Sequence, residues 1–425
     1  RQRRLERQQQ GQRHRAARAA MTLSLLLPLQ AALAQETIKI AFIGPFSGSF
    51  APQGDAFLKQ IQYSLDVVNA KGGALGKKFE IVTFDDKLQP AEATIALKSA
   101  TDQNIKLVLQ CIGSNVAAAM IDGVSKYNAR NPDRQILYLN CAALADDLTE
   151  DKCDFWHFRF AANVSMRVAT MVRSIPKTID TVYLMNQDYL YGQSVRAQML
   201  EQLKAVRPDV KVVGDDLVPL GKVKDFSPYI AKVKASGAKA VMTSNWGVDF
   251  NQLLKSGVET GLDVQYYTLS AHLNGAPTAM GEGGINRVHA ALDSHMNIPF
   301  EAANTEGAAW MQGFRDKYPE FDYVWINFRT MFEFVAAAIN KAGSVDALKI
   351  ALALEGMQAN DAFGQPNTIR KDDHQLHTSF YQAGFVKGVK LDSEKTGAGW
   401  KTESTIPAAE LTKPPACPMK RPRGA

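Results

Sequence analysis

Residues 36–86 read ETIKIAFIGPFSGSFAPQGDAFLKQIQYSLDVVNAKGGALGKKFEIVTFDD. Residues 38–43 form a β-branched and aromatic run that Gly44 and Pro45 stop, as expected of a short buried strand. The apolar residues that follow recur at helical spacing: Phe57, Ile61, Leu65 and Val68. Glycines then turn the chain into a second strand at residues 79–84. The stretch predicts a strand–helix–strand unit whose first loop, rich in Gly, Ser and Pro, lies where open α/β sheets bind ligands.

Strand-like and helix-like segments alternate through the rest of the chain. Strands are predicted at residues 106–112, 135–141, 181–186, 210–218, 240–244, 264–269 and 288–293. Helices are predicted at residues 115–128, 193–206, 226–235, 250–259, 305–318, 324–342 and 345–356. Such alternation favours parallel sheets covered by helices on both faces. So many strands are more readily divided between two lobes than placed in one sheet.

The chain resembles the periplasmic branched-chain amino-acid-binding proteins, the solute receptors of ABC uptake systems, in two motifs: IGPFSGSFAPQG at residues 43–54 and NAKGGALGKKFEIVTFDD at residues 69–86. The similarity runs from about residue 37 to about residue 390. It implies an α/β fold of the type I periplasmic-binding-protein class, with two Rossmann-like lobes that have parallel-sheet cores and are joined by three crossing segments. Ligand would bind in the cleft between the lobes, which would close around it by a hinge motion.

The resemblance also implies a division of the chain. The first lobe would comprise residues 35–160 and 295–362, and the second lobe residues 161–294 and 363–400. The crossing segments would fall near residues 158–163, 292–298 and 358–368. Residues 401–425, rich in Lys, Arg and Pro towards their end, are predicted to be a flexible basic tail.

The beginning of the chain predicts export. Residues 1–20 are rich in Arg, residues 22–33 are mostly apolar, and Ala32-Leu33-Ala34 matches a small-x-small cleavage site. Residues 1–34 are therefore predicted to be a signal peptide, removed on the way to the periplasm. The alternative is a basic arm joined to a membrane anchor, but the apolar run is short for a span and is broken by Pro28.

Charge is concentrated in that leader. Residues 1–34 contain seven Arg and one Glu, which leaves 42 basic and 42 acidic side chains in the rest of the chain. A near-neutral chain lacks the basic excess that nucleic-acid binding requires, so no nucleic-acid partner is predicted.

Four cysteines occur, at positions 111, 141, 153 and 417. In an oxidising compartment, Cys141 and Cys153 are candidate partners closing a short loop, with free thiols as the alternative. Cys111 lies in an apolar run and is predicted to be a buried thiol. No C-x-x-C pair accompanies these cysteines, and no metal site is predicted. His374 and His377 are expected in a solvated loop, with a metal pair as the alternative.

The loop after the strand at residues 106–112 carries Gly113, Ser114 and Asn115 at the start of a helix. Ser114 or Asn115 is predicted to be the N-cap, and free amides at a helix start favour an anion. The resemblance implies that Ser114 grips a ligand carboxylate; a plain helix cap is the alternative. It also places Gln53 at the cleft.

The resemblance assigns a second ligand-binding loop after the strand at residues 135–141. Ala142 and Ala143 match its small residues, which offer main-chain groups to the ligand, and simple loop packing is the alternative. Leu144 stands where the family has Thr, so one hydroxyl contact is lost.

Aromatic residues mark the second lobe. Tyr191 in a D-x-x-Y-G turn, Trp246 after a strand and Tyr323 match aromatic walls of the family's pocket, although core packing is the alternative for each. Ser270 falls where the family places an acid that pairs with the ligand ammonium. Asp249 is a substitute candidate for that acid, and His272 is a candidate donor to an extra anionic group. A carboxylate without an α-amine thus rivals an amino acid as the ligand.

No combination of residues in the sequence demands catalysis. It contains neither G-x-G-x-x-G, nor a phosphate-binding G-x-x-x-x-G-K-[ST], nor a G-x-S-x-G elbow. Asp85 and Asp86 are expected to be structural or at the cleft rim. No catalytic residue and no cofactor are predicted.

These features together predict the periplasmic solute-binding component of an ABC uptake transporter, which captures a small amino acid or related organic carboxylate. Its partners would be that ligand and an inner-membrane ABC permease, and the protein would be a monomer. An extracytoplasmic ligand sensor of the same fold is the alternative, and an α/β enzyme is a more distant one.

Overall fold

The computed structural model describes residues 36–424. The chain divides into two units, residues 1–37 and residues 38–425, and the fold below belongs to the second unit. The predicted signal peptide, residues 1–34, lies outside the described residues. Within the described part of the chain, none of the helices combines the length and apolarity needed to cross a bilayer.

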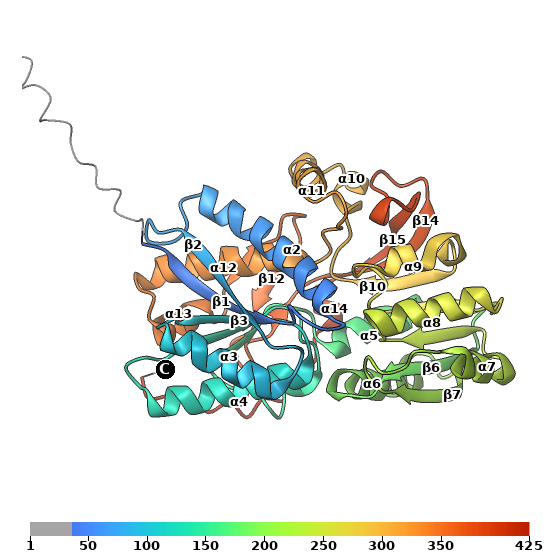
Figure 1. Ribbon diagram of the computed structural model, residues 1–425, viewed down its shortest axis with the longest axis horizontal. Helices are drawn as coiled ribbons and strands as arrows, with labels where there is room; N and C mark the ends of the chain where they lie inside the picture. The colour runs from blue at the N-terminus through green and yellow to red at the C-terminus, as the bar shows by residue number, and fades with distance from the viewer. Residues whose placement is uncertain (1–35, 425) are drawn as a thin grey trace, which may run out of the picture. The chain divides into compact units, whose positions relative to one another are not determined.

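The first lobe is built on a parallel sheet of strand order β2-β1-β3-β4-β5. Its strands are β1 (Ile38–Gly44), β2 (Phe79–Asp85), β3 (Leu107–Gln110), β4 (Leu137–Asn140) and β5 (His157–Arg159). Its helices are α2 (Ala51–Ala70), α3 (Pro90–Asp102), α4 (Ser114–Arg130), α12 (Ile326–Ala342) and α13 (Ala347–Leu354). Every residue of β3 and β4 is buried, as in a sheet covered on both faces. Late in the chain, α12 returns to pack against α2 (Figure 1).

The second lobe contains a mixed sheet of strand order β15-β14-β10-β9-β8-β6-β7. Its strands are β6 (Thr181–Gln187), β7 (Lys211–Val218), β8 (Ala240–Thr243), β9 (Gln265–Thr268), β10 (Val288–Leu292), β14 (Phe380–Lys387) and β15 (Ala398–Ile406). The helices of this lobe are α5 (Val164–Ser174), α6 (Leu190–Val206), α7 (Ser227–Ser236), α8 (Val248–Glu259) and α9 (Ala276–Met280). Strands β6 to β10 pair in parallel, whereas β14 runs antiparallel to both β10 and β15.

Between β1 and β15 the chain passes three times between the lobes, as the fold prediction requires. The first passage joins β5 to α5, and the second joins β10 to α12 through α10 (Ile298–Glu301) and α11 (Thr305–Lys317). The third joins α13 to β14 through a small antiparallel sheet of β11 (Gln358–Asn360), β12 (Pro366–Ile369) and β13 (Leu376–His377). The two-lobed α/β fold class is therefore confirmed.

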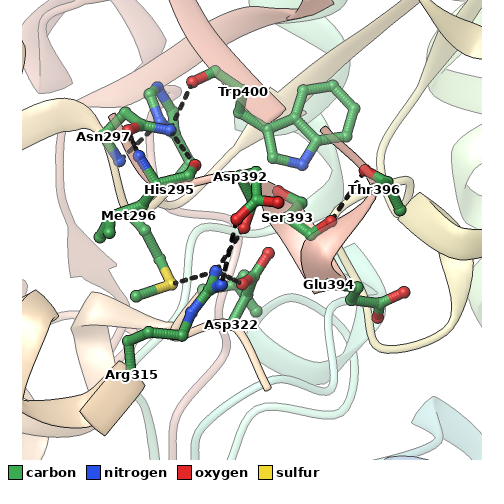
Figure 2. A network of polar contacts seen from close by, with 12 residues as sticks. His295, Met296, Asn297, Arg315, Asp322, Asp392, Ser393, Glu394, Thr396 and Trp400 are labelled. Atoms are coloured by element: carbon green, nitrogen blue, oxygen red, sulfur yellow. Dashed lines mark hydrogen bonds and ion pairs between the residues drawn. The ribbon is translucent and has the colours of Figure 1, made fainter. Parts of the chain in front are cut away.

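A polar network fixes the second passage to the β14–β15 hairpin (Figure 2). The Arg315 guanidinium bonds the Asp322 carboxylate at 2.5 Å and the main-chain oxygen of Asp392 at 2.5 Å. Asn297 Nδ2 donates to the carbonyl oxygens of Leu391 and Trp400 at 2.8 and 3.1 Å. Burial raises the pKa of Asp322 to about 6, against the lowering effect of Arg315. The hairpin and this passage thus form one packed region.

The prediction that residues 401–425 form a flexible tail is wrong for part of that segment. Residues 401–406 belong to β15, and α14 (Ala408–Leu411) follows it. Further on, Cys417 is disulfide-bonded to Cys153. The Pro-rich composition suggested a free segment, but a covalent bond and strand pairing hold these residues to the fold.

The predicted disulfide between Cys141 and Cys153 is also wrong. The structure pairs Cys111 with Cys141 and Cys153 with Cys417. Cys111 and Cys141 directly follow the neighbouring strands β3 and β4, which brings their Cα atoms to 4.7 Å. Strand adjacency, not closeness in sequence, therefore decides the partner, and Cys111 is buried as predicted but not a free thiol.

The histidine at position 374 is not in a solvated loop. Its side chain is buried, stacks on Phe158 with ring centroids 3.8 Å apart, and bonds Glu355 through Nε2 at 3.0 Å. His377 bonds Thr412 Oγ1 through Nδ1 at 2.7 Å. Both histidines contribute to packing between the third passage and its neighbours.

Candidate ligand-binding site

A cavity lies between the loops that follow the parallel strands of the two lobes. The volume open to the centre of a water-sized sphere is about 50 Å³, whereas one buried water needs about 10–15 Å³ on the same measure, so the cavity suits a small molecule. Its lining residues are Gln53, Phe57, Cys111, Ile112, Gly113, Ser114, Ala142, Ala143, Leu144, Tyr189, Tyr191, Trp246, Leu269, Ser270, Leu273 and Trp325. Most of them come directly after β3, β4, β6, β8 or β9, at the strand ends where open α/β sheets bind ligands.

Ser114 is the first residue of α4 and lines the cavity. Its Oγ accepts a hydrogen bond from the Ala145 amide at 3.3 Å, so its hydroxyl proton is still available to a ligand. The N-cap is Gly113, with φ of 91°, so the prediction that Ser114 or Asn115 caps the helix is wrong. A Cβ on Gly113 would also lie 2.7 Å from Leu88 Cδ1. Ser114 thus brings a hydroxyl donor to the cavity at the start of α4, and donors at a helix start are of the kind that favours an anion.

Two predicted residues lie where the lobes meet. Asn115 does not line the cavity, and its Oδ1 accepts from the Leu190 amide of the second lobe at 3.3 Å. Gln53 does line the cavity, and its Nε2 donates to the Asn274 carbonyl oxygen at 3.4 Å. The Gln53 Oε1 atom has no partner among the described residues. Asn115 thus makes a contact between the lobes, and Gln53 is a lining residue with a buried, unpaired acceptor.

Ala142 and Ala143 line the cavity, but their amides are already engaged. Both donate to Asn140 Oδ1, at 3.2 and 2.9 Å, and Asn140 Nδ2 donates back to the Ala143 carbonyl oxygen at 2.9 Å. The two main-chain amides that were expected to donate to a ligand therefore already donate to the Asn140 side chain. Leu144 adds apolar surface at this wall.

Five aromatic side chains are among the lining residues of the described chain: Phe57, Tyr189, Tyr191, Trp246 and Trp325. Tyr191 and Trp246 were predicted from the sequence. Trp246 is fixed by a hydrogen bond from its Nε1 to the Tyr189 hydroxyl at 2.8 Å and by contact with Phe50, whose ring centroid lies 4.7 Å away.

Tyr323, the third predicted aromatic wall, does not line the cavity. It is fully buried, bonds Ser64 Oγ at 2.6 Å, and packs edge-on against Trp310 with ring centroids 4.4 Å apart. Trp325, two residues later, lines the cavity instead. The aromatic residues at 323–325 correctly predict an aromatic wall of the cavity. Which of the two rings faces the cavity depends on how the chain enters α12, and the sequence does not show this.

No charged side chain is among the lining residues of the described chain. Ser270 lines the cavity at the position where an ammonium partner was sought. Asp249 does not, because its Oδ2 accepts from Gln187 Nε2 at 2.7 Å and from the Gly221 amide at 2.8 Å. Burial raises the pKa of Asp249, which further weakens it as a partner for a cation. The structure thus does not bring the predicted acid to the cavity.

Comparison with known proteins agrees with this geometry. The family model described as "Periplasmic binding protein" matches residues 37–390. "Leu/Ile/Val-binding protein homolog 4" of Brucella melitensis is 30% identical over 407 residues, covering 94% of this chain and 96% of that protein. The chain therefore belongs to the periplasmic binding protein family, whose name implies a periplasmic location.

Solved structures show the same fold. The leucine-, isoleucine-, valine-, threonine- and alanine-binding protein from Brucella ovis, in its closed conformation, aligns with a TM-score of 0.81 at 28% identity, covering 91% of this chain and all of that one. An ABC-transporter solute-binding protein from Rhodopseudomonas palustris BisB5, in complex with 3,4-dihydroxybenzoic acid, aligns with a TM-score of 0.75 at 17% identity, covering 88% and 98%. The relatives are solute-binding proteins, and this chain is one by family.

Proposed function

We propose that this protein is the substrate-binding component of an ABC uptake transporter and that it captures a small apolar or aromatic carboxylate between its lobes. The composition of the cavity lining favours this class of ligand, because the lining is rich in aromatic rings and has no acidic side chain among the described residues. In this proposal Gln53, Ser114, Ala142, Ala143, Tyr191, Trp246 and Ser270 contact the ligand.

The carboxylate would be held at the start of α4. Ser114 supplies a hydroxyl there, and the first-turn amides of the helix have no acceptor inside the helix. Hydrogen bonds to a charged group contribute about 1.5–3 kcal/mol each. This end of the cavity therefore suits an anion without needing a Lys or Arg.

The case against an α-amine is energetic. A charge left buried without a partner costs several kcal/mol, whereas a cation–π contact with Trp246 or a neighbouring ring would return about 0.5–2 kcal/mol. With Asp249 engaged by Gln187 and Gly221, the balance favours a ligand that lacks the ammonium group.

A branched-chain amino acid is the second candidate. Two observations favour it: the Brucella relatives are named for binding such amino acids, and the lining residue Gln53 has an acceptor, Oε1, without a partner in the described chain. The Rhodopseudomonas structure holds an aromatic acid in the same fold, so the fold alone accommodates either class.

Titration calorimetry with matched pairs of ligands separates the two candidates. Each pair differs only in the amine: leucine with 4-methylpentanoate, and phenylalanine with 3-phenylpropanoate. We expect the amine-free member to bind more tightly in at least one pair. Tighter binding of the amino acid in both pairs would show instead that the ligand is an amino acid. The affinity of the Asp249→Asn variant for that amino acid would then show whether Asp249 binds the amine.

The proposal extends to the protein's partners and processing. A permease of the inner membrane would accept the ligand, the protein would act as a monomer without catalysis, and residues 1–34 would be removed on export. The predicted lobe boundaries and crossing segments belong to the same proposal. N-terminal sequencing of exported protein and light scattering test cleavage and monomeric state, and recovery of the bound compound unchanged tests the absence of turnover.

A further inference from the structure

The start of α2 contacts the second lobe beside the cavity. Phe50, the N-cap residue of α2, packs against Trp246 with ring centroids 4.7 Å apart. Three residues later in the chain, Gln53 Nε2 donates to the Asn274 carbonyl oxygen at 3.4 Å. Trp246 and Asn274 belong to the second lobe, whereas α2 belongs to the first. The two contacts therefore join the lobes at the cavity, which Gln53 and Trp246 both line.

Two glycines of the second lobe make room for the Phe50 ring. A Cβ added to Gly221 would lie 3.0 Å from Phe50 Cε2, and a Cβ added to Gly247 would lie 3.3 Å from Phe50 Cε1. Both distances are shorter than the best separation of two carbon atoms, about 3.5–4.0 Å, so a larger residue at either position would crowd the ring. Gly221, Gly247 and Trp246 thus form a notch for this ring, which we call the Phe50 notch.

Asp249 fixes the shape of the Phe50 notch. Its Oδ2 accepts from the Gly221 amide at 2.8 Å and from Gln187 Nε2 at 2.7 Å. Gln187 Nε2 also donates to the Trp246 carbonyl oxygen at 3.2 Å. Asp249 lies in the first turn of α8, and Gly247 is the N-cap of that helix. One buried carboxylate therefore ties the loop of Gly221 to the start of α8, and the two walls of the notch are held together.

We infer that Phe50 is a positioning residue that holds the lobes closed around the ligand, and that the Phe50 notch is its docking site on the second lobe. Phe50 is not among the lining residues of the described chain, so it acts on the ligand through the position of the lobes and through Trp246. The inference rests on the proposed function, because it concerns closure around a bound solute. It holds for a solute with or without an amine.

Closure sets the affinity of a hinged binding protein. The lobes must separate to admit or release a ligand, and their separation exposes the Phe50 ring and its notch to water. A contact made only in the closed form shifts the equilibrium between the open and closed forms towards the closed one. Phe50 therefore raises the affinity for every ligand by the same factor, chiefly by slowing release.

The test is the substitution Phe50→Ala, with affinity measured by calorimetry and release by stopped-flow fluorescence. The probes are leucine, phenylalanine and their amine-free counterparts, 4-methylpentanoate and 3-phenylpropanoate. Each probe that binds the wild-type protein should bind the variant about tenfold more weakly, because an aromatic contact and its burial are lost. The ratios between probes should not change, and release should be faster. An unchanged affinity, or a loss confined to one class of probe, would overturn the inference.

Phe46→Ala is the matched control for that substitution. Phe46 lies in the same loop before α2, is also partly buried and is not a lining residue. Its ring packs edge-on against Phe42 of the first lobe, with centroids 5.4 Å apart. Affinities and release rates of this variant should stay close to those of the wild type. A loss as large as that in Phe50→Ala would assign the effect to the loop and not to docking on the second lobe.

A second variant tests the notch and leaves the Phe50 ring in place. Gly221→Ala puts a methyl group 3.0 Å from Phe50 Cε2, and this crowding should weaken binding of all probes by about threefold or more. The positive φ of 66° at Gly221 strains Ala in the open and the closed form alike, so this strain does not change affinity. Gly237→Ala carries the same strain at a φ of 69°, but within the described chain no atom lies within 4 Å of a Cβ there, and it should bind as the wild type does.

Combining the two substitutions isolates the contact. In the Phe50→Ala background, Gly221→Ala should no longer weaken binding, because the ring that the methyl group crowds is gone. An equal loss with and without Phe50 would overturn the docking of the ring in the notch. If Gly221→Ala does not fold, Phe50→Ala and its control still decide.

The outcomes also separate this inference from the proposed function. Tighter binding of the amino acids would change the class of ligand and leave the Phe50 prediction in place, because closure acts on both classes alike. If none of the probes binds, the proposed ligand class fails and the ligand-free protein decides. Phe50→Ala should then have a larger radius of gyration in small-angle scattering than the wild type, and equal radii would overturn the inference.

Discussion

Ser114 is the residue on which the choice of an anionic ligand depends. Its hydroxyl lines the cavity at the start of α4, and its only bond in the described chain leaves the proton free to donate. Replacing it by Ala should weaken binding of the best carboxylate by about 1–3 kcal/mol, because a bond to a charged group is lost. Calorimetry measures this loss.

A matched control for that substitution is Ser99→Ala on α3, where an exposed hydroxyl donates to the Ile95 carbonyl oxygen at 3.1 Å and the residue is not part of the lining. It should leave the affinity as in the wild type. Unchanged affinity in Ser114→Ala for every ligand would show that the carboxylate is bound elsewhere.

Asp86 gives stability a pH dependence. Its side chain is fully buried at the end of β2, its Oδ1 accepts from the Leu88 amide at 2.8 Å, and its Oδ2 has no partner among the described residues. Burial raises its pKa to about 7, whereas the unfolded value is about 3.9. The folded state therefore retains this proton to a higher pH than the unfolded state does. The protein has the full stability that the protonated Asp86 allows below about pH 4, and it loses that contribution as the pH rises through about 7.

Asp86→Asn should remove this dependence. Relative to wild type, the free energy of unfolding of the variant should rise between pH 4.5 and pH 7.5 by on the order of 2–4 kcal/mol, since one pKa unit corresponds to about 1.4 kcal/mol. Urea unfolding at both pH values measures it, with Asp133→Asn at an exposed loop as the control. Parallel stability profiles of wild type and Asp86→Asn would contradict the expected ionisation.

At the scale of elements, the disulfide between Cys111 and Cys141 ties together the loops that follow β3 and β4. These loops carry Ser114 and the Ala142–Ala143 pair, and Cys111 itself lines the cavity. Replacing both cysteines by Ala should lower the free energy of unfolding by about 2–4 kcal/mol. It should also weaken ligand binding, because the two binding loops lose their common anchor.

Thermal unfolding and calorimetry under oxidising conditions test this prediction. The control is the Cys153→Ser, Cys417→Ser pair, whose bond lies outside the cavity lining and should affect affinity less. Wild-type affinity in the Cys111→Ala, Cys141→Ala protein would show that the loops hold their positions without the bond.

Elements also show which parts of the fold the sequence reveals. The apolar runs of β1, β3 and β8 are fully or almost fully buried, so local pattern alone identifies them. The helix α3 and the β14–β15 hairpin were missed. Three of the nine residues of β15 are exposed and polar, and its antiparallel pairing with β14 cannot be read from a local sequence pattern.

The same division holds for the cavity. Loops after parallel strands are predictable ligand sites, and Ser114, Tyr191, Trp246 and Ser270 do line it. The sequence does not predict which side chains point into the cavity, because this depends on tertiary packing. Thus Asp249 turns to Gln187, and Tyr323 joins a separate aromatic cluster while Trp325 faces the cavity.

At the scale of the whole fold, the C-terminal segment makes a further link between the lobes. After β15, α14 packs against α5, and Lys413 pairs with Glu201 at 3.3 Å, both contacts being with the second lobe. The segment then reaches the first lobe, where Cys417 bonds Cys153 and Arg421 pairs with Glu355 at 2.7 Å. This C-terminal link spans the two bodies that must separate when a hinged binding protein opens.

Small-angle scattering should therefore show two effects. A tight ligand should reduce the radius of gyration of the wild-type protein, because the lobes close around it. The Cys153→Ser, Cys417→Ser variant should have a larger radius without ligand and a larger contraction with it, because the covalent part of the C-terminal link no longer limits opening. The Cys111→Ala, Cys141→Ala variant should contract as the wild type does, since that bond lies within one lobe. A radius unchanged by saturating ligand would mean that the cavity is a rigid pocket, and equal radii in both disulfide variants would mean that the link does not restrain the hinge.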